Sequence, residues 1–156
     1  MNTISNEFLL TAEGLTSLKS ELSELTTTKR IDIAQRLKEA KADGDLSENA
    51  MYDAARDEQQ FVEGRIAEIE HILKHAKIIE GKSKGGAVTL GSTVHVELKD
   101  GRQQYTIVGS TEANPDLGRI SNDSPIGKAL LGKKPGDQVE VVVPVGKLTY
   151  KIVKVE

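Results

Sequence analysis

Two stretches of apolar residues at heptad spacing, separated by a short polar segment, constrain the fold of this chain more than any other feature. The first stretch runs from Thr11 to about Ala42 and the second from Glu48 to about Lys77, so each predicted helix has about 30 residues and a length of roughly 45 Å. The heptad positions are Leu15, Leu18, Leu22, Leu25, Ile33, Leu37 and Ala40 in the first stretch and Ala55, Val62, Ile66, Ile69, Leu73 and Ala76 in the second. Because each narrow apolar stripe needs a partner, the two helices are expected to fold back on each other as an antiparallel coiled-coil hairpin. Pairing of the stripes between two copies of the chain is the alternative.

The apolar stripe of the first predicted helix changes register at Thr26-Thr27-Thr28. Threonine has only modest helix propensity, and the apolar spacing resumes at Ile33. The pattern predicts one long helix with a shifted stripe.

The second half of the chain has a different periodicity. Residues 81–86 are rich in Gly, Lys and Ser, which is typical of a linker. Beyond them, apolar and polar residues alternate over residues 94–98, and Asp100-Gly101 is a strong signal for a hairpin turn. This alternation predicts antiparallel β-strands.

A second strand pair and a short helix complete the pattern. Residues 138–143 and 148–155 form the predicted pair, and Ser124-Pro125 is typical of a helix start, with Ser as N-cap and Pro at the first helical position. The fold class is therefore a two-domain α plus α+β protein. The predicted organisation is a coiled-coil hairpin at 1–80 with an acidic tip at 43–48, a linker at 81–86, and an α+β domain at 87–156 with a small antiparallel sheet and one short helix.

Composition excludes several classes of site. The chain has no cysteine, which excludes disulfides, thiolate metal sites and cysteine nucleophiles. Residues 1–80 carry 16 acidic and 10 basic side chains, and residues 81–156 carry 8 and 11. An acidic N-terminal half argues against binding duplex DNA on its own, because that requires many phosphate-neutralising Lys and Arg side chains.

Residues 1–7 lack the charge pattern of a signal peptide, and no apolar run approaches the roughly 18 residues of a membrane span. A cytoplasmic protein without membrane contact is therefore expected.

Asp45 and Glu48 are the candidate functional residues of the predicted hairpin tip. Their spacing matches a capping box, in which Asp45 would accept a hydrogen bond from the amide of Glu48 and cap the second helix. Alternatively, two carboxylates three residues apart lie on one side of a helix start and can hold a hard divalent cation such as Mg²⁺. The cation keeps waters and phosphate oxygens as its other ligands. Two carboxylates do not make a complete metal cage, so this interpretation predicts that the pair completes a metal site on another molecule.

The chain resembles the bacterial Gre-type transcript cleavage factors over essentially its whole length, and among them the GreA branch. The residues that carry the resemblance are Gly44-Asp45-Leu46-Ser47-Glu48-Asn49-Ala50, Tyr52, Ala54-Ala55-Arg56 and Glu63-Gly64-Arg65-Ile66 in the first half, and Asn122-Asp123-Ser124-Pro125-Ile126-Gly127 and Leu131-Gly132-Lys133 in the second.

The resemblance implies a protein that is not itself an enzyme. Such a protein binds RNA polymerase through its second domain and inserts its coiled coil into the secondary channel of the polymerase. There Asp45 and Glu48 would help to hold a weakly bound second Mg²⁺ and position the attacking water, so that the polymerase cleaves the backtracked nascent RNA near its 3′ end. This is two-metal catalysis with one metal site completed in trans. The isolated protein is expected to bind no cofactor and to be a monomer, and the alternative is a steric regulator or inhibitor of the same channel that does not stimulate cleavage.

The resemblance also implies roles for residues outside the acidic pair. Lys41 and Arg56 match positions at which the family carries basic residues that contact the transcript, although solvated surface charges are the alternative. The second domain is expected to resemble FK506-binding prolyl isomerases in fold while lacking the aromatic walls of their pocket. A further match is a segment implicated in the family's grip on the polymerase, made of Asp123, Ser124, Pro125 and Ile126. Ser-Pro in this segment is also simply a helix start.

Two features of the second predicted helix bear on metal binding. Met51 stands where the family often carries Glu, and the loss of a third acid leaves the strength of cation binding open. His71 and His75 are four residues apart and could share a metal ion, but no third ligand is nearby in the sequence, so surface or seam-edge histidines are expected.

Overall fold

The computed structural model of the chain describes residues 7–42, 49–79 and 86–156. The chain divides into two compact units, one of Leu15–His75 and one that combines Met1–Gly14 with Ala76–Glu156. The residues that precede the first heptad stripe therefore belong to the same unit as the C-terminal half.

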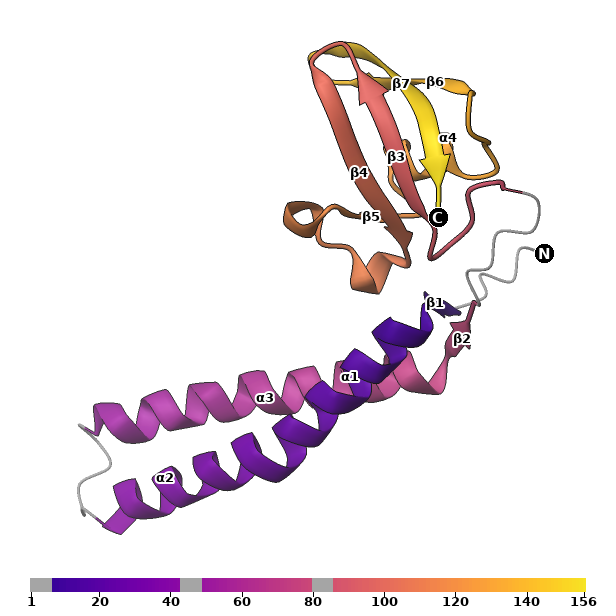
Figure 1. The fold of residues 1–156 in the computed structure, drawn as a ribbon. Coiled ribbons are helices and arrows are strands. Elements are labelled where there is room, and N and C mark those ends of the chain that lie inside the picture. Colours follow the sequence, from indigo (N-terminus) through magenta and orange to yellow (C-terminus); the bar gives the residue numbers. More distant parts are fainter. Residues whose placement is uncertain (1–6, 43–48, 80–85) are drawn as a thin grey trace, which may run out of the picture. The chain divides into compact units, whose positions relative to one another are not determined.

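The helical unit is built from a long helical segment and one returning helix. The segment comprises α1 (Ala12–Glu24), η1 (Leu25–Lys29) and α2 (Arg30–Ala42), and the returning helix is α3 (Ala50–Lys74). Figure 1 shows α2 and α3 side by side. The two helices are antiparallel: Arg30 bonds Glu63, and Arg36, six residues later in α2, bonds Glu58, five residues earlier in α3. The predicted antiparallel hairpin within one chain is confirmed.

The core of the helical unit lies along the predicted stripe. Ile33, Val62 and Ile66 are buried against one another, with the partly buried Leu22, Leu25 and Leu37 packed around them. Since apolar burial between two narrow stripes is the main stabilising contribution available to such a hairpin, these contacts hold the two helices together.

The predicted register shift takes the form of a π-helical turn, η1. The hydroxyl of Thr26 donates to the carbonyl of Leu22 at 2.8 Å, and that of Thr27 donates to the carbonyl of Ser23 at 2.6 Å. Threonine hydroxyls that bond the preceding turn bend and loosen helices, and a π-turn inserts one extra residue into the helical register. The threonines thus move the apolar stripe without ending the helix.

Charged pairs join the two sides of the hairpin. Arg65 Nε and Nη2 donate to the two carboxylate oxygens of Glu21 at 2.7 and 2.9 Å, and Arg30 makes the same fork to Glu63 at 2.8 Å. The hydrogen bonds from Arg65 lower the pKa of Glu21, and those from Arg30 lower the pKa of Glu63. All four side chains keep about a third or more of their surface exposed, so the pairs fix the alignment of the helices more than they add stability.

The end of the second helix differs from the prediction. Helix α3 ends at Lys74, not near Lys77, and Ala76 lies in strand β2 (Ala76–Ile78). Strand β2 pairs in parallel with β1 (Phe8–Leu10), and the amide of Ile79 donates to the carbonyl of Leu10 at 2.9 Å. The heptad position assigned to Ala76 was therefore wrong, because pairing with a segment almost 70 residues away in the sequence replaces the last helical turn.

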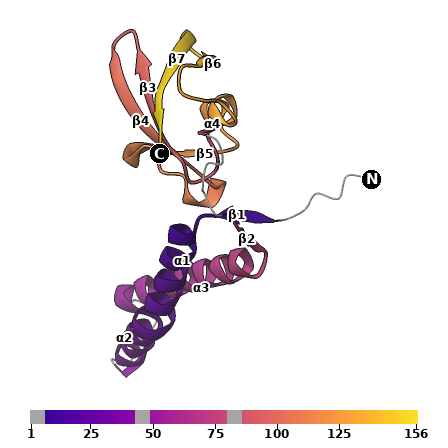
Figure 2. The ribbon, with the colours of Figure 1, turned by 45° about the vertical axis from the view of Figure 1, so that its right-hand side comes forward.

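The sheet unit contains a five-stranded sheet. Its strands are β3 (Thr93–Leu98), β4 (Gly101–Val108), β5 (Arg119–Ser121), β6 (Gln138–Val143) and β7 (Gly146–Val155), in the order β5-β4-β3-β7-β6. Every neighbouring pair is antiparallel except β4 and β5, which are parallel. The predicted small antiparallel sheet is confirmed apart from the parallel pairing of β4 with β5, which the sequence did not predict (Figures 1 and 2).

One face of the sheet is covered by the short helix α4 (Pro125–Leu130), as Figure 2 shows. Leu130 of α4 is fully buried against the inward residues of the strands. The buried core of this unit consists of Val88, Leu90, Val94, Val96, Ile107, Leu130, Val139, Val141, Tyr150 and Ile152. Alternation along β3, β4, β6 and β7 places the strand residues of this core on one face, as a half-covered antiparallel sheet requires.

The N-terminal segment is bound to the sheet unit through a buried carboxylate. Glu112, in the short helix η3 (Ser110–Glu112), has a side chain only 5% exposed. It accepts hydrogen bonds from the amide and the hydroxyl of Thr11 at 2.8 and 2.6 Å and from Arg119 Nη2 at 3.0 Å. A buried charge with this many partners is costly to disturb, so the contact fixes Thr11 to the sheet unit. A second short helix, η4 (Pro115–Leu117), precedes β5.

The apolar seam of the hairpin gives a direct stability test. Ile33 is 1% exposed, so Ile33→Ala leaves a cavity and is expected to lower the free energy of unfolding by about 2–5 kcal/mol. Ile31, two residues away and 64% exposed, is the matched control, and Ile31→Ala is expected to stay within about 0.5 kcal/mol. Urea unfolding followed by far-UV circular dichroism measures both, and equal effects would show that the stripe is not the seam.

Candidate functional site

The two helices of the hairpin end close to the predicted acidic tip. Helix α2 ends at Ala42 and α3 begins at Ala50, with Asn49 as its N-cap. Asp45 and Glu48 lie outside the described residues. The described residues nearest to this pair in the sequence are the end of α2 and the start of α3.

Asn49 makes the contacts that begin α3. Its Oδ1 accepts hydrogen bonds from the amides of Met51 and Tyr52, both at 3.1 Å. Amides of a first helical turn have no intrahelical partner, and an Asn side chain at the N-cap is among the best acceptors for them. The capping-box interpretation of the acidic pair is thus wrong, because α3 starts later and is capped by Asn49.

Asn49 also contacts the other helix. Its Nδ2 donates to the carbonyl oxygen of Ala40 in the last turn of α2 at 3.0 Å. The side chain therefore joins the end of α2 to the start of α3. Sequence reasoning missed this residue, although asparagine is one of the preferred capping types and would have been found by testing each position of the turn as an N-cap.

The two predicted RNA-contacting residues lie on the helices that flank the tip. Lys41 is in the last turn of α2 and Arg56 is in the second turn of α3, and both are exposed. Arg56 Nη1 donates to Gln59 Oε1 at 3.0 Å on its own helix. Within residues 7–42, 49–79 and 86–156, neither side chain pairs with a carboxylate.

Met51 is 77% exposed at the start of α3. The position at which the family often carries an acid is therefore on the surface beside the tip. A thioether there offers no charge to a hard cation such as Mg²⁺.

The predicted polymerase-contacting segment divides into exposed and internal residues. Ser124 caps α4, because its Oγ accepts a hydrogen bond from the amide of Gly127 at 3.0 Å, and Ile126 packs against the core of the sheet unit. Asp123 and Pro125 are exposed. The helix-start interpretation of Ser124 is confirmed, and a partner of this face would meet Asp123 and Pro125.

The carboxylate of Asp123 is oriented by a residue that sequence reasoning missed. Ser110 Oγ donates to Asp123 Oδ2 at 2.8 Å, and the amide of Asp123 donates to Ser121 Oγ at 3.1 Å. A depression of about 390 Å³ lies beside this carboxylate and is lined by Glu7, Phe8, Leu9, Ser110, Thr111, Asn122 and Asp123. No local sequence signal marked Ser110, because it reaches Asp123 only through the folding of η3 toward β5.

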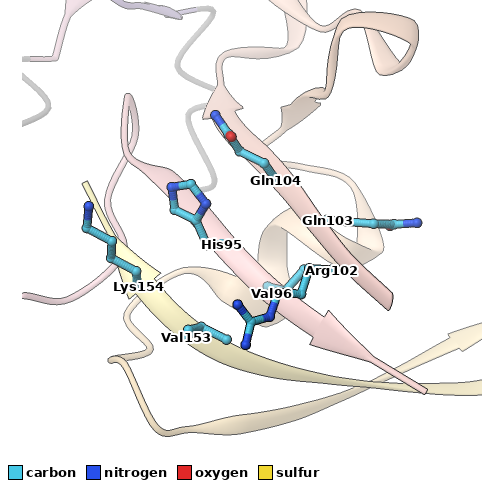
Figure 3. A pocket seen from close by; sticks show the side chains of 7 residues that line it. All are labelled: His95, Val96, Arg102, Gln103, Gln104, Val153 and Lys154. Carbon is cyan, nitrogen blue, oxygen red and sulfur yellow. The ribbon is translucent and has the colours of Figure 1, made fainter. Parts of the chain in front are cut away.

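A second depression, of about 380 Å³, lies on the outer face of the sheet at the bulge between β3 and β7 (Figure 3). In Figure 3, His95 stands between Gln104 of β4 and Lys154 of β7, its partners in the strand register. Glu156 bonds both Lys154 and His95, and these hydrogen bonds lower the pKa of Glu156. The cationic groups on this rim already have carboxylate partners, so the depression offers no free charge to a ligand.

Two tyrosines of the sheet unit pack together, Tyr150 in the buried core and Tyr105 partly buried against it. Tyr105 and Tyr150 meet edge to face with ring centroids 6.3 Å apart, and Tyr150 is 2% exposed. Burial raises the pKa of Tyr105, and Tyr150 beside it contributes to the shift. These rings pack against each other rather than walling a pocket.

The rings of His71, in the last turn of α3, and of His75, the C-cap of that helix, lie close together at an angle of 52°. Their ring centroids are 4.5 Å apart, and His75 Nδ1 lies 2.9 Å from the carbonyl oxygen of His71. Among the residues that the structure describes, no group of three or more His, Asp or Glu side chains could hold a metal ion.

Comparison with known proteins defines the class of this fold and site. The family described as "Transcription elongation factor, N-terminal" matches residues 8–78, and the one described as "Transcription elongation factor, GreA/GreB, C-term" matches residues 82–156. The chain belongs to the GreA/GreB family of transcription elongation factors.

Within that family the similarity is to bacterial GreA. Transcription elongation factor GreA of Listeria welshimeri is 52% identical over 151 residues, covering 95% of this chain and 94% of the relative. GreA of Bacillus subtilis is 52% identical over 150 residues, covering 95% and 96%. Among solved structures, GreA factor homolog 1 of Thermus thermophilus is 32% identical with a TM-score of 0.46, covering 97% of this chain and 99% of that one. The resemblance inferred from the sequence motifs is confirmed.

No helix within the described parts of the chain is long and apolar enough to cross a membrane.

Proposed function

We propose that this protein binds RNA polymerase, inserts its helical hairpin into the secondary channel, and stimulates the polymerase's own Mg²⁺-dependent cleavage of backtracked nascent RNA. Membership of the GreA/GreB family over both halves of the chain supports this role. The observation that carries it further is the N-cap of α3. Because Asn49 caps that helix, a structural need for a helix cap does not account for Asp45 and Glu48.

The acidic pair would act as ligands in trans. Asp45 and Glu48 supply two carboxylates, the hard oxygen donors that Mg²⁺ prefers, while the remaining ligands come from the polymerase, water and the transcript phosphate. A Mg²⁺ ion held in this way polarises the phosphoryl oxygens and lowers the pKa of bound water. The carboxylates of this chain would hold the cation and orient a water for attack on the phosphorus of the scissile phosphodiester. The bond from phosphorus to the 3′ oxygen of the upstream RNA would break, which leaves a 3′ hydroxyl on that RNA and a 5′ phosphate on the released fragment. The catalyst is the polymerase, and the protein is a stimulating factor without an active site of its own.

The rest of the molecule would deliver and align the pair. Exposed Lys41 and Arg56 would contact phosphates of the transcript's 3′ portion, since neither is engaged by a described carboxylate. Asp123 and Pro125 would contact the polymerase directly, while Ser124 and Ile126 shape that surface from within. The pairing of α2 with α3 would give the acids a stiff support, whereas a flexible segment would dilute them. We expect a monomeric, cytoplasmic factor.

Stalled, backtracked RNA polymerase complexes with labelled transcript provide the test. With Mg²⁺ and the purified protein, transcripts are expected to shorten and then to resume elongation from the new 3′ end. The protein incubated with free RNA is expected to release nothing. Binding to the complexes without faster cleavage would instead identify a steric regulator of the channel.

A further inference from the structure

The depression beside Asp123 combines apolar residues with carboxylates. Phe8 and Leu9 of β1 line it together with Asn122 and Asp123, which follow β5, and all of them belong to the same compact unit. Its volume of about 390 Å³ is near the lower limit for small-molecule sites. Its described lining contains two acidic side chains, Glu7 and Asp123, and no basic one. The depression therefore has the size and the charge to receive one cationic side chain of a partner.

The carboxylate of Asp123 keeps its negative charge uncompensated. Ser110 Oγ donates to its Oδ2 at 2.8 Å, and a neutral hydroxyl orients a carboxylate without cancelling the charge. As far as the structure describes the chain, no Lys, Arg or His side chain pairs with Asp123. Glu7 differs, because Lys77 Nζ lies 3.9 Å from its Oε2. Asp123 is therefore the group that a cation entering the depression would bind.

The side chain of Asp123 is oriented before any partner binds. Besides the bond from Ser110, the amide of Asp123 donates to Ser121 Oγ at 3.1 Å, and the hydroxyls of Ser110 and Ser121 lie 3.1 Å apart. A side chain that is already held in place loses less conformational entropy in a complex. The network thus prepares this carboxylate for an ion pair.

Arginine fits this lining better than lysine does. Its planar guanidinium forms a fork with a carboxylate and packs on aromatic faces, and its aliphatic stem covers apolar surface. Asp123 supplies the carboxylate, Phe8 the aromatic ring and Leu9 the apolar surface. Arginine is also enriched at protein interfaces, whereas lysine is depleted there.

We propose that the depression lined by Phe8, Leu9, Ser110 and Asp123 binds an arginine side chain of RNA polymerase. The proposal rests on the proposed function and adds β1 and η3 to the surface that contacts the polymerase. Asp123 binds the guanidinium directly. Ser110 is a positioning residue, because it acts through the carboxylate of Asp123.

Asp123→Asn and Ser110→Ala separate the charge from its orientation. Asp123→Asn keeps the size of the side chain, and its dissociation constant for RNA polymerase is expected to rise about tenfold or more. The salt dependence of binding should also weaken, because one ion pair across the interface is lost. Ser110→Ala keeps the charge, so a rise of roughly threefold with unchanged salt dependence is expected.

Asp116→Asn is the matched control. Asp116 is an exposed acid of the same unit that does not line the depression, so its neutralisation should leave polymerase affinity unchanged. Asp116, Asp123 and Ser110 are all exposed, so the thermal midpoints of the three variants are expected to match that of the parent.

Chemical modification of the polymerase identifies the side chain that is bound. Phenylglyoxal reacts with accessible arginine side chains, and mass spectrometry of the polymerase peptides shows which of them a bound factor protects. With each variant at a saturating concentration, one polymerase arginine is expected to be protected by the parent and by Asp116→Asn. The same arginine is expected to react in the complex with Asp123→Asn.

The opposite results overturn the proposal. If Asp123→Asn binds like the parent, or if every polymerase arginine reacts equally in the two complexes, the depression does not bind arginine, although the parent can still stimulate cleavage. If Ser110→Ala binds like the parent, Ser110 has no positioning role. A parent protein that does not bind RNA polymerase at all refutes the proposed function and the arginine site together.

Discussion

The variants Asp45→Asn and Glu48→Gln are each expected to slow the stimulated transcript cleavage by about a hundredfold at a fixed low Mg²⁺ concentration. A loss of this size is typical when one preorganised charge-stabilising group is removed from an active site. Both changes preserve the size of the side chain and remove its negative charge. The charge and number of carboxylate ligands set the affinity for a hard cation, so each variant should bind Mg²⁺ poorly in the assembled complex. The rate of transcript shortening in backtracked complexes measures the effect, and raising the Mg²⁺ concentration should restore part of it.

The same variants are expected to keep their affinity for the polymerase, measured by competition with labelled parent protein. Their helical content should also be unchanged, because Asn49 caps α3. Asp53→Asn is the matched control, since Asp53 is an exposed acid in the first turn of α3 and its neutralisation should leave cleavage intact. Variants of Asp45 and Glu48 that cleave like the parent would refute the metal role. Variants that no longer bind would make the tip a docking element instead.

The hairpin and the main sheet were predictable because their signals are local. Heptad spacing places Ile33, Val62 and Ile66 on facing stripes, and the two stripes are buried against each other. The threonine run predicted the register shift because hydroxyl bonds to the preceding turn act within one helix. Alternation likewise predicted the strands β3 and β4 around the turn at Asp100-Gly101.

The parallel pairings were not predictable from local pattern. Strands β1, β2 and β5 have three residues each, too few to establish an alternation. Their pairings join residues distant in the sequence, such as Leu9 with Lys77. The same difficulty applies to Ser110, whose contact with Asp123 depends on how η3 meets the end of β5.

The two helix caps show what separates a correct prediction from a wrong one. Ser124 was identified as the cap of α4 because Pro125 follows it. Proline is favoured at the first helical position, so it marks the residue before it as the N-cap. The start of α3 has no such marker, and several residues before Ala50 are good caps by type. The acidic pair matched a capping box by spacing alone, and the tertiary bond from Asn49 to Ala40 favours the later start.

Gly127→Ala is expected to lower the free energy of unfolding by about 2 kcal/mol or more and to weaken polymerase binding, although alanine is the better helix former. A Cβ at Gly127 would lie 2.0 Å from the carbonyl oxygen of Ser121 and 3.0 Å from Ser124 Oγ. Backbone must move to admit it, so overpacking outweighs the gain in helix propensity of about 1 kcal/mol. The displaced carbonyl also accepts hydrogen bonds from the amide and hydroxyl of Ser124, so the turn that presents Asp123 would be disturbed.

Gly64→Ala is the matched change in α3 and is expected to have the opposite sign. A Cβ at Gly64 would have no neighbour within 4 Å, so the substitution should stabilise the helical unit by up to about 1 kcal/mol. Chemical unfolding measures the change in the free energy of unfolding of both variants, and their affinity for the polymerase is measured in parallel. Opposite signs would show that the backbone of Ser121, rather than helix propensity, selects glycine in the proposed polymerase-contacting segment. Two stabilised variants would mean that this segment yields to the extra methyl group and is not held as tightly as its hydrogen bonds indicate.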